Sequence, residues 1–151
     1  MGSTYVTFRG HGFEANDSAL EIWLALLARE IDELTAVPDW LRAVRDEWHL
    51  QSTAGFGFGV MPGLDRFIDS EDKRQTLIDI GVRTLSKLEA RGPVISREEL
   101  NRLGTGGEGA VFTQDVPVSD LVRPARYFIK LLQGNLEAWE SDSRFEPTHK
   151  P

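Results

Sequence analysis

The sequence predicts a mainly helical protein: a compact bundle of about four main helices, with at most a small N-terminal strand or hairpin. Apolar residues recur at helical spacing in several long segments, and strand-like alternation is confined to Tyr5–Phe8. The chain has 151 residues, of which 40% are hydrophobic, as is usual for one domain. We therefore expect a single globular helical domain over residues 1–139 and a polar, mobile tail over 140–151.

The first helix is expected over residues 18–35, after a short strand at Tyr5–Phe8 and a loop at 10–16. Ser18 and Glu21 have the spacing of a capping box, in which both side chains accept hydrogen bonds from free backbone N–H groups. The apolar stripe that follows is wide: Leu20, Ile22, Trp23, Leu24, Leu26, Leu27, Ile31 and Leu34. A stripe of this width predicts a helix at the centre of the fold.

The second helix is expected over residues 38–51, with Pro38 in its first turn, where a missing N–H costs nothing. Trp40 and Trp48 fall on one face of this helix, as core residues usually do. The segment Gly55–Gly63 then contains four glycines, one proline and large apolar residues. Because glycine permits unusual backbone geometry and the apolar residues favour burial, we expect a structured, partly buried loop.

Two further main helices are expected over residues 70–91 and 124–134, with a short helix from Ser96 to Leu103 between them. Gly104 is expected to end the short helix, and Pro124 is expected to begin the last one. Periodicity places the following residues of the whole chain in the core: Trp23, Leu27, Ile78, Val82, Leu85, Phe128 and Leu131.

Composition and charge exclude several classes of function. The chain has no cysteine, which rules out disulfides, Cys-ligated metals and thiol nucleophiles. It shows no secretion signal and no apolar run long enough to span a bilayer, so we expect a cytoplasmic protein. A net charge of −7 argues against a nucleic-acid partner.

The candidate catalytic motifs are weak, and we expect neither a metal nor a cofactor. The three histidines do not have the spacing of metal ligands. The segment Gly104–Gly109 resembles a phosphate-binding loop, but it lacks the closing Lys-Ser/Thr and contains Glu108, which favours a structural role. His11 could pair with Asp17 as a general base. An alternative site would therefore combine His11, Asp17, Phe56 and Phe58.

A local excess of acidic residues predicts a surface that recognises a basic partner. Six carboxylates between residues 30 and 47 are accompanied by only two cations, Arg42 and Arg45. Acidic charges of this kind accelerate association with a basic protein. An ordinary solvated helix face, or pairing with the two arginines, would account for the same pattern. The predicted partner-binding residues are Glu30, Asp32, Glu33, Asp39, Asp46 and Glu47.

Several motifs in the first part of the chain resemble a family of small bacterial proteins. They are the run from Gly12 to Leu24, Trp40-Leu41, Arg45-Asp46-Glu47-Trp48 and Gly55–Gly59. That family is similar in character to the immunity proteins of polymorphic toxin systems. The resemblance implies a cytosolic antitoxin that binds and blocks a toxin domain, and it supplies no catalytic residue. The partner would then be a basic toxin domain.

Two other interpretations stay open at this point. One is a small enzyme or small-molecule-binding protein that uses His11, Asp17 and the Gly55–Gly63 loop. The other is a homodimer or a subunit of a larger assembly. A deep polar pocket beside His11 would favour the enzyme, and a large apolar patch would favour the oligomer.

Overall fold

The computed structural model describes residues 2–55, 59–107, 109–136 and 139–141. The helical class predicted from the sequence is confirmed, and four of the helices in this part of the chain have 15 or more residues. The helices are α1 (Asp17–Asp32), α2 (Asp39–Thr53), α3 (Leu64–Phe67), α4 (Glu71–Ala90), α5 (Arg97–Leu103) and α6 (Ser119–Gln133). None of these helices is both long and apolar enough to cross a membrane.

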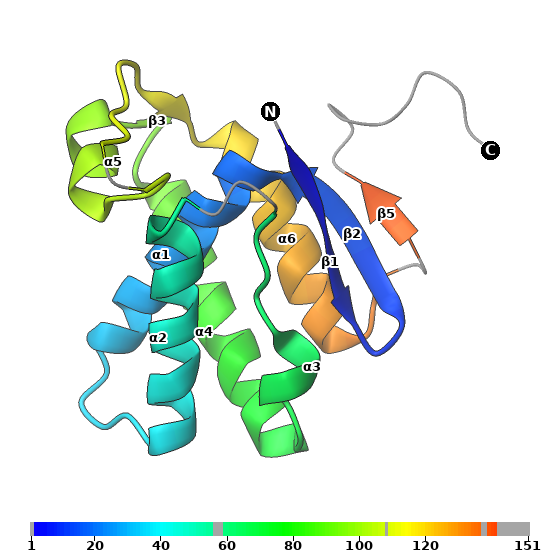
Figure 1. The fold of residues 1–151 in the computed structure, drawn as a ribbon. Helices are drawn as coiled ribbons and strands as arrows, with labels where there is room; N and C mark the ends of the chain where they lie inside the picture. The colour runs from blue at the N-terminus through cyan, green and yellow to red at the C-terminus, as the bar shows by residue number, and fades with distance from the viewer. Residues whose placement is uncertain (1, 56–58, 108, 137–138, 142–151) are drawn as a thin grey trace.

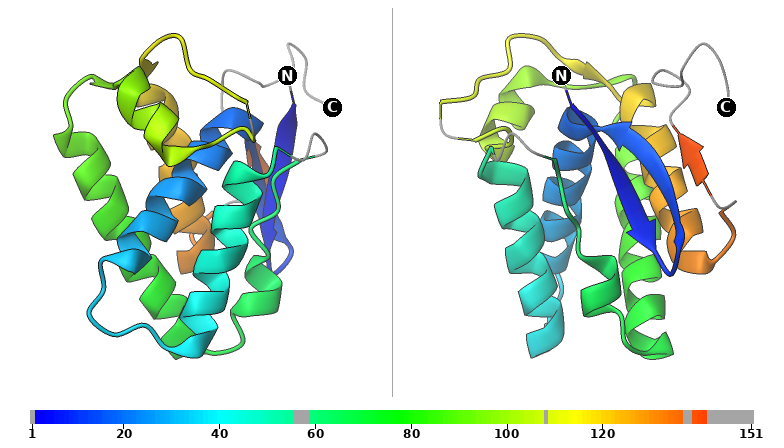
Figure 2. Two further views of the ribbon diagram at one scale, coloured as in Figure 1. Left: turned by 60° about the vertical axis from the view of Figure 1, so that its left-hand side comes forward. Right: turned by 45° about the vertical axis from the view of Figure 1, so that its right-hand side comes forward.

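Helix α1 lies at the centre of the molecule, with the other long helices packed around it (Figures 1 and 2). Leu20 and every residue from Ile22 to Ala28 are buried. The ring of Phe128 on α6 meets the rings of Trp23 and Trp48 edge-on, at centroid distances of 6.0 and 5.8 Å. These aromatic contacts join α1, α2 and α6 in one core.

A three-stranded sheet covers one side of the helices, so the fold is not a pure helical bundle (Figure 1). Strand β1 (Ser3–Phe8) pairs antiparallel with β2 (His11–Asn16), and the prediction of a loop over residues 10–16 is wrong. Arg9 and Gly10 both have positive φ angles, 52° and 80°. A two-residue turn of this kind matches the twist of paired strands and closes a tight hairpin.

The remaining strands are short. Strand β5 (Trp139–Ser141) pairs parallel with β2, so residues 140 and 141 of the predicted tail belong to the sheet. The rest of that tail, 142–151, lies outside the described residues. Strands β3 (Val94–Ile95) and β4 (Val116–Pro117) form a second, two-stranded sheet beside α5.

The helix ends follow local capping rules, with two corrections to the prediction. Ser70 and Ser96 accept hydrogen bonds from backbone N–H groups at the starts of α4 and α5, as expected. Helix α1 is capped by Asn16 instead of Ser18. Helix α6 begins at Ser119, so Pro124 lies inside it. At the start of α1 the sequence offers both Asn16 and Ser18 as capping residues, whereas α6 begins after Val118 without a capping side chain.

The predicted core is largely confirmed. Trp23, Leu27, Ile78, Phe128 and Leu131 are buried. Leu85 is half-buried, and Val82 is 45% exposed, so its predicted burial is wrong. Among the long helices, α4 makes its main contacts with α1 and α6, and its buried stripe is narrower than its apolar periodicity suggests.

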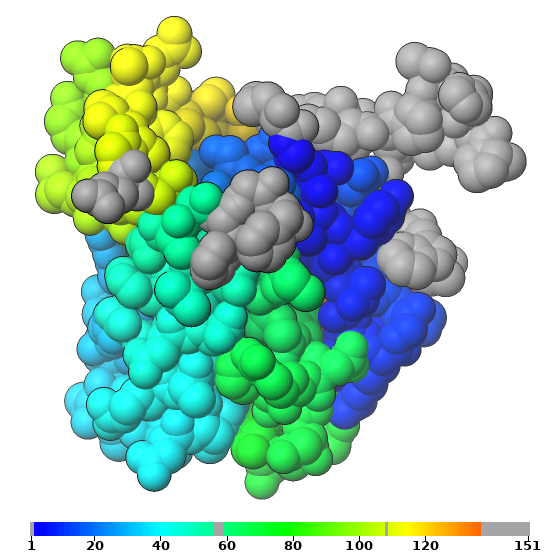
Figure 3. All heavy atoms as spheres, in the orientation of Figure 1, coloured from blue at the N-terminus to red at the C-terminus, as the bar shows by residue number. Residues whose placement is uncertain are grey.

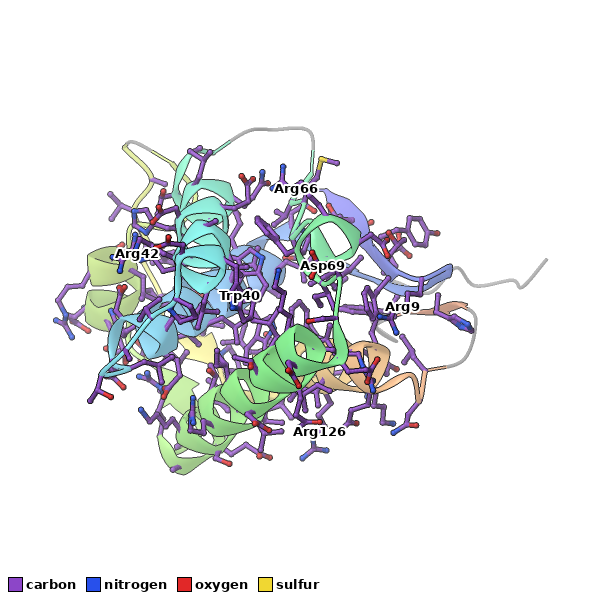
Figure 4. The ribbon with its side chains drawn as sticks, turned by 90° about the horizontal axis from the view of Figure 1, so that it is seen from below. Arg9, Trp40, Arg42, Arg66, Asp69 and Arg126 are labelled. Atoms are coloured by element: carbon purple, nitrogen blue, oxygen red, sulfur yellow. The ribbon has the colours of Figure 1, made fainter. Side chains whose placement is uncertain are left out.

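Polar contacts join α2 to α3 and α4 on the lower side of the molecule, which Figure 4 shows from below. Arg66 of α3 forms an ion pair with Glu47 of α2 at 3.4 Å. The ammonium group of Lys73 lies over the ring of Trp40, 5.4 Å from its centroid. Trp40 is therefore a half-buried helix contact and does not form an open aromatic platform.

Leu27 and Val82 provide a matched test of the core. Leu27→Ala leaves a cavity beside α1, and we expect it to lower the free energy of unfolding by about 2–5 kcal/mol. Val82→Ala removes an exposed side chain, and we expect a change within about 0.5 kcal/mol. Urea denaturation followed by tryptophan fluorescence measures both. Equal losses in the two variants would contradict the central position of α1.

Candidate functional site

The six acidic residues predicted to bind a partner are largely occupied by ion pairs within the protein. Glu30 is buried and contacts Lys87 at 2.8 Å and Arg83 at 3.6 Å. Glu33 contacts the same Lys87 at 2.7 Å. Both cations belong to α4, which packs beside α1. The sequence separates these groups by more than 50 residues, so counting local charges does not reveal the pairing.

The other four acids are distributed around α2. Arg45 holds Asp32 through two hydrogen bonds, at 2.9 and 3.0 Å, and lies 3.5 Å from Asp46. These carboxylates raise the pKa of the Arg45 guanidinium. Glu47 pairs with Arg66. In the part of the chain that the structure describes, Asp39 alone among the six has no ion pair, so the surface as a whole is close to neutral.

His11 and Asp17 lie at opposite ends of β2 and do not form a catalytic pair. His11 is the first residue of the strand and Asp17 follows its last, a separation of about 20 Å at the rise of an extended chain. A cavity of about 230 Å³ beside His11 is lined by Arg9, Arg74 and mostly apolar residues. Phe56 and Phe58, the other members of the alternative site, lie outside the described residues.

Asp17 instead joins the two glycine-rich loops in a shared surface. The N-terminal end of α1, the C-terminal end of α2 and the two loops surround a small cavity of about 190 Å³. We call this region the loop surface, and include with the cavity lining the neighbouring exposed residues Leu50 and Met61. The loop surface consists of Asp17, Glu21, Leu50, Gln51, Gly55, Gly59, Val60, Met61 and Gly106.

Hydrogen bonds fix the segment after residue 59 against its neighbours. The hydroxyl of Thr4 on β1 donates to Asp17 and accepts from the N–H of Val60. The side-chain carbonyl of Gln51 accepts from the N–H of Met61 at 2.9 Å. Figure 3 shows the end of α2, the segment after residue 59 and β1 side by side on one face. The loop surface is therefore built from segments that are distant in the sequence.

The two glycine-rich loops touch each other through their backbones. The N–H of Gly106 donates to the carbonyl of Ser52 at 3.1 Å. A Cβ on Gly55 would lie 2.8 Å from the carbonyl oxygen of Gly106 and 3.0 Å from the Cα of Gly107. No side chain fits at this contact without displacing backbone, which explains the glycines. This supports the structural role predicted for Gly104–Gly109.

Asp17 and Glu21 give the loop surface a negative charge that no cation of the described residues neutralises. The two carboxylates are one helical turn apart at the start of α1. Partial burial, followed by the negative charge of Asp17, raises the pKa of the Glu21 carboxyl. Because the fold disfavours the charged form of Glu21, ionisation of this carboxyl lowers the stability of the folded protein. Sequence analysis missed Glu21 because it assigned this residue to a capping box.

Two large apolar side chains close in sequence to the cavity lining are exposed. Met61 is 61% exposed and Leu50 is 47% exposed. Leu50 precedes Gln51, and Gln51 holds the backbone of Met61, so the two apolar residues flank the side chain that lines the cavity. These two side chains are candidates for contact with a partner protein, because the backbone that carries Met61 is fixed by hydrogen bonds.

The loop surface has neither a metal-binding group nor a cavity of ordinary ligand size among the described residues. The described residues contain no group of three His, Asp or Glu side chains that could hold a metal ion. The cavity at the loop surface is smaller than the roughly 300–1,000 Å³ of ordinary ligand pockets. No protein-family model, curated protein or solved structure matches the chain. The functional interpretation therefore depends on the chain's own geometry.

The contact between the glycine-rich loops can be tested with two alanine substitutions. Gly55→Ala places a Cβ against the Gly106–Gly107 backbone at a φ of +67°, whereas Gly10 (φ +80°) has no neighbour within 4 Å of its added Cβ. We expect Gly10→Ala to cost about 1–2 kcal/mol from backbone strain, and Gly55→Ala about 1–3 kcal/mol more. Chemical denaturation measures the difference. Equal costs would show that the loops are not in contact.

The raised pKa of Glu21 predicts a pH-dependent gain in stability for Glu21→Gln. Because the folded protein binds this proton more tightly than the unfolded chain does, the stabilising contribution is present at low pH and is lost as pH rises through the raised pKa. Glu21→Gln should therefore melt above the parent at pH 7, and this advantage should disappear below about pH 4. Glu14→Gln, on the neighbouring strand, is the control. A constant difference across pH would contradict the assignment.

Proposed function

We propose that the protein is a binding protein of the immunity type, which blocks a toxin domain by direct contact through the loop surface. The single observation that carries this proposal is that the segments of the loop surface carry exposed Met61 and Leu50 as well as Asp17 and Glu21, two carboxylates that have no ion pair among the described residues. Apolar groups would supply most of the contact energy. The carboxylates would select a basic partner.

The loop surface replaces the acidic face of α1 and α2 as the main contact in this proposal. Breaking the pairs of Glu30 and Glu33 with Lys87 to reach a partner would expose α4 cations to the same partner. A basic protein gains little from a surface whose charges are already balanced. Asp39 has no ion pair among the described residues, but it begins α2 and lies about 18 Å along the helix axis from Gln51, so it is not part of the loop surface.

Backbone rigidity also supports inhibition by the loop surface. The Trp48 indole N–H donates to the carbonyl of Pro62 at 2.8 Å inside the core. This bond anchors the end of the loop next to Met61. A pre-formed contact loses less entropy on binding than a flexible one, as tight inhibition of a toxin requires.

The direct experiment uses the gene next to that of this protein. An immunity protein is expected beside a gene for a large secreted protein with a variable C-terminal domain. That toxin domain should arrest growth when expressed alone in the cytoplasm, and co-expression of this protein should restore growth. Purified toxin domain and protein should form a stable complex by gel filtration. Growth arrest without rescue, and no complex, would overturn the proposal.

Substitutions within the loop surface test where the complex forms. We expect Leu50→Ser with Met61→Ser to weaken the complex by about 10- to 100-fold, because central apolar contacts dominate interface energy. Val82→Ser with Val111→Ser removes two equally exposed apolar residues elsewhere and should leave affinity within about two-fold. Surface plasmon resonance measures both variants. Equal affinity of the two double variants would place the contact elsewhere.

A further inference from the structure

A groove on the opposite side of the molecule carries a positive charge that neither the fold nor the loop surface explains. Its volume is about 820 Å³, and it runs between α6 and the turn that follows α4. Arg123, Arg126, Tyr127 and Lys130 line it from α6, and Gly92 and Pro93 line it from the turn. In Figure 4, Arg126 lies on the opposite side of the molecule from Arg66. Arg66 marks the side of the loop surface, because its ion-pair partner Glu47 accepts a hydrogen bond from Gln51.

The charge of this groove, which we call the basic groove, is opposite in sign to the net charge of the chain. Three cations line it, and Glu89 is the one carboxylate among its described lining residues. Glu89 is already paired with Arg126 at 2.9 Å. Arg123 and Lys130 are exposed and have no ion pair in the described part of the chain. A protein with a net charge of −7 therefore keeps two unneutralised cations at one groove, which attracts anionic groups locally.

The arrangement of the cations favours an extended ligand over a single anion. Arg123, Arg126 and Lys130 share one face of α6 because their spacing follows the helical repeat. Arg123 and Lys130 are about 10.5 Å apart along the helix axis, at a rise of 1.5 Å per residue. An extended peptide covers this distance with about three residues. A compact anion such as phosphate could contact only one end of the row.

The floor of the groove is apolar and fixed. Val122 is half-buried, and Val118 is buried next to it. The Tyr127 ring packs against the ring of Phe13 on β2, with centroids 5.7 Å apart. Since this ring is half-buried against the sheet, it does not offer the free face on which nucleic-acid bases stack. An apolar side chain between two carboxylates fits this floor.

We propose that the basic groove binds an acidic peptide segment of a partner protein. Carboxylates of the segment pair with Arg123 and Lys130, and an apolar side chain between them lies on Val122. The segment binds in extended form along α6. Because the loop surface lies on the other side of the molecule, this second site is independent of the proposed contact with a toxin domain.

The test uses the full chain, labelled with ¹⁵N, and a synthetic nonapeptide of the sequence Gly-Glu-Glu-Leu-Glu-Leu-Glu-Glu-Gly. At low salt, addition of this peptide should shift the backbone amide signals of α6 and of the turn at residues 92–93. Affinity should fall steeply as salt is added, since exposed charges are screened. A peptide with every Glu replaced by Gln should bind at least about ten-fold more weakly.

Matched variants locate the site. Arg123→Glu with Lys130→Glu should weaken binding of the acidic peptide at least about ten-fold, and Arg123→Gln with Lys130→Gln should weaken it less. Arg42→Glu with Arg102→Glu makes the same change in net charge on other surfaces and should stay within about two-fold of the parent. Circular dichroism checks that each variant folds.

Several results would overturn the proposal. Equal losses in the groove variant and the control variant would show only a general charge effect. Tighter binding of an oligothymidylate than of the acidic peptide would make the groove a nucleic-acid site. Equal binding of the Glu and Gln peptides, or shifts confined to residues outside the groove, would exclude recognition of acidic side chains there.

Discussion

The structure depends on the burial of α1 on all sides. Trp23 and Leu27 are fully buried, and so are their neighbours from Ile22 to Ala28. A helix that is apolar around its whole circumference is stable in water only when other elements cover every side of it. Helices α2, α4 and α6 and the β2 strand provide that cover. The hairpin is thus part of the core, since Val6, Phe8 and Phe13 complete the apolar layer.

Covering α1 also determines which charges remain available to a partner. Because α4 must pack along α1, Lys87 comes within ion-pair distance of Glu30 and Glu33. Hydrogen bonding to that ammonium group lowers the pKa of the Glu33 carboxyl, and the two carboxylates raise the pKa of Lys87. These charges stabilise the packing of two helices. Glu30 and Glu33 are therefore not free for recognition, although in the sequence they belong to the acidic segment from residue 30 to residue 47.

Sequence reasoning succeeded where the signal was local and failed where it depended on distant residues. Helical periodicity identified α1, α2 and α4. It missed β2, because the strand takes its register from β1 across a two-residue turn. Sequence reasoning also missed Glu21 and the basic groove, because both depend on contacts between distant parts of the chain. Their character depends on which cations and carboxylates the fold brings close, and one chain read in order does not contain that information.

The charges that remain after internal pairing are therefore better guides to function than the net charge. At the loop surface, Asp17 and Glu21 have no cation nearby among the described residues, and the resulting cost in stability is visible in the raised pKa of Glu21. At the basic groove, Arg123 and Lys130 have no ion pair within the described part of a chain that has seven more acidic than basic residues. Ion pairs with other residues of the chain could neutralise both surfaces without changing the core, because all four side chains lie outside the core. Two surfaces of opposite charge on one small domain would attract chemically different partners, because each surface favours groups of the opposite sign.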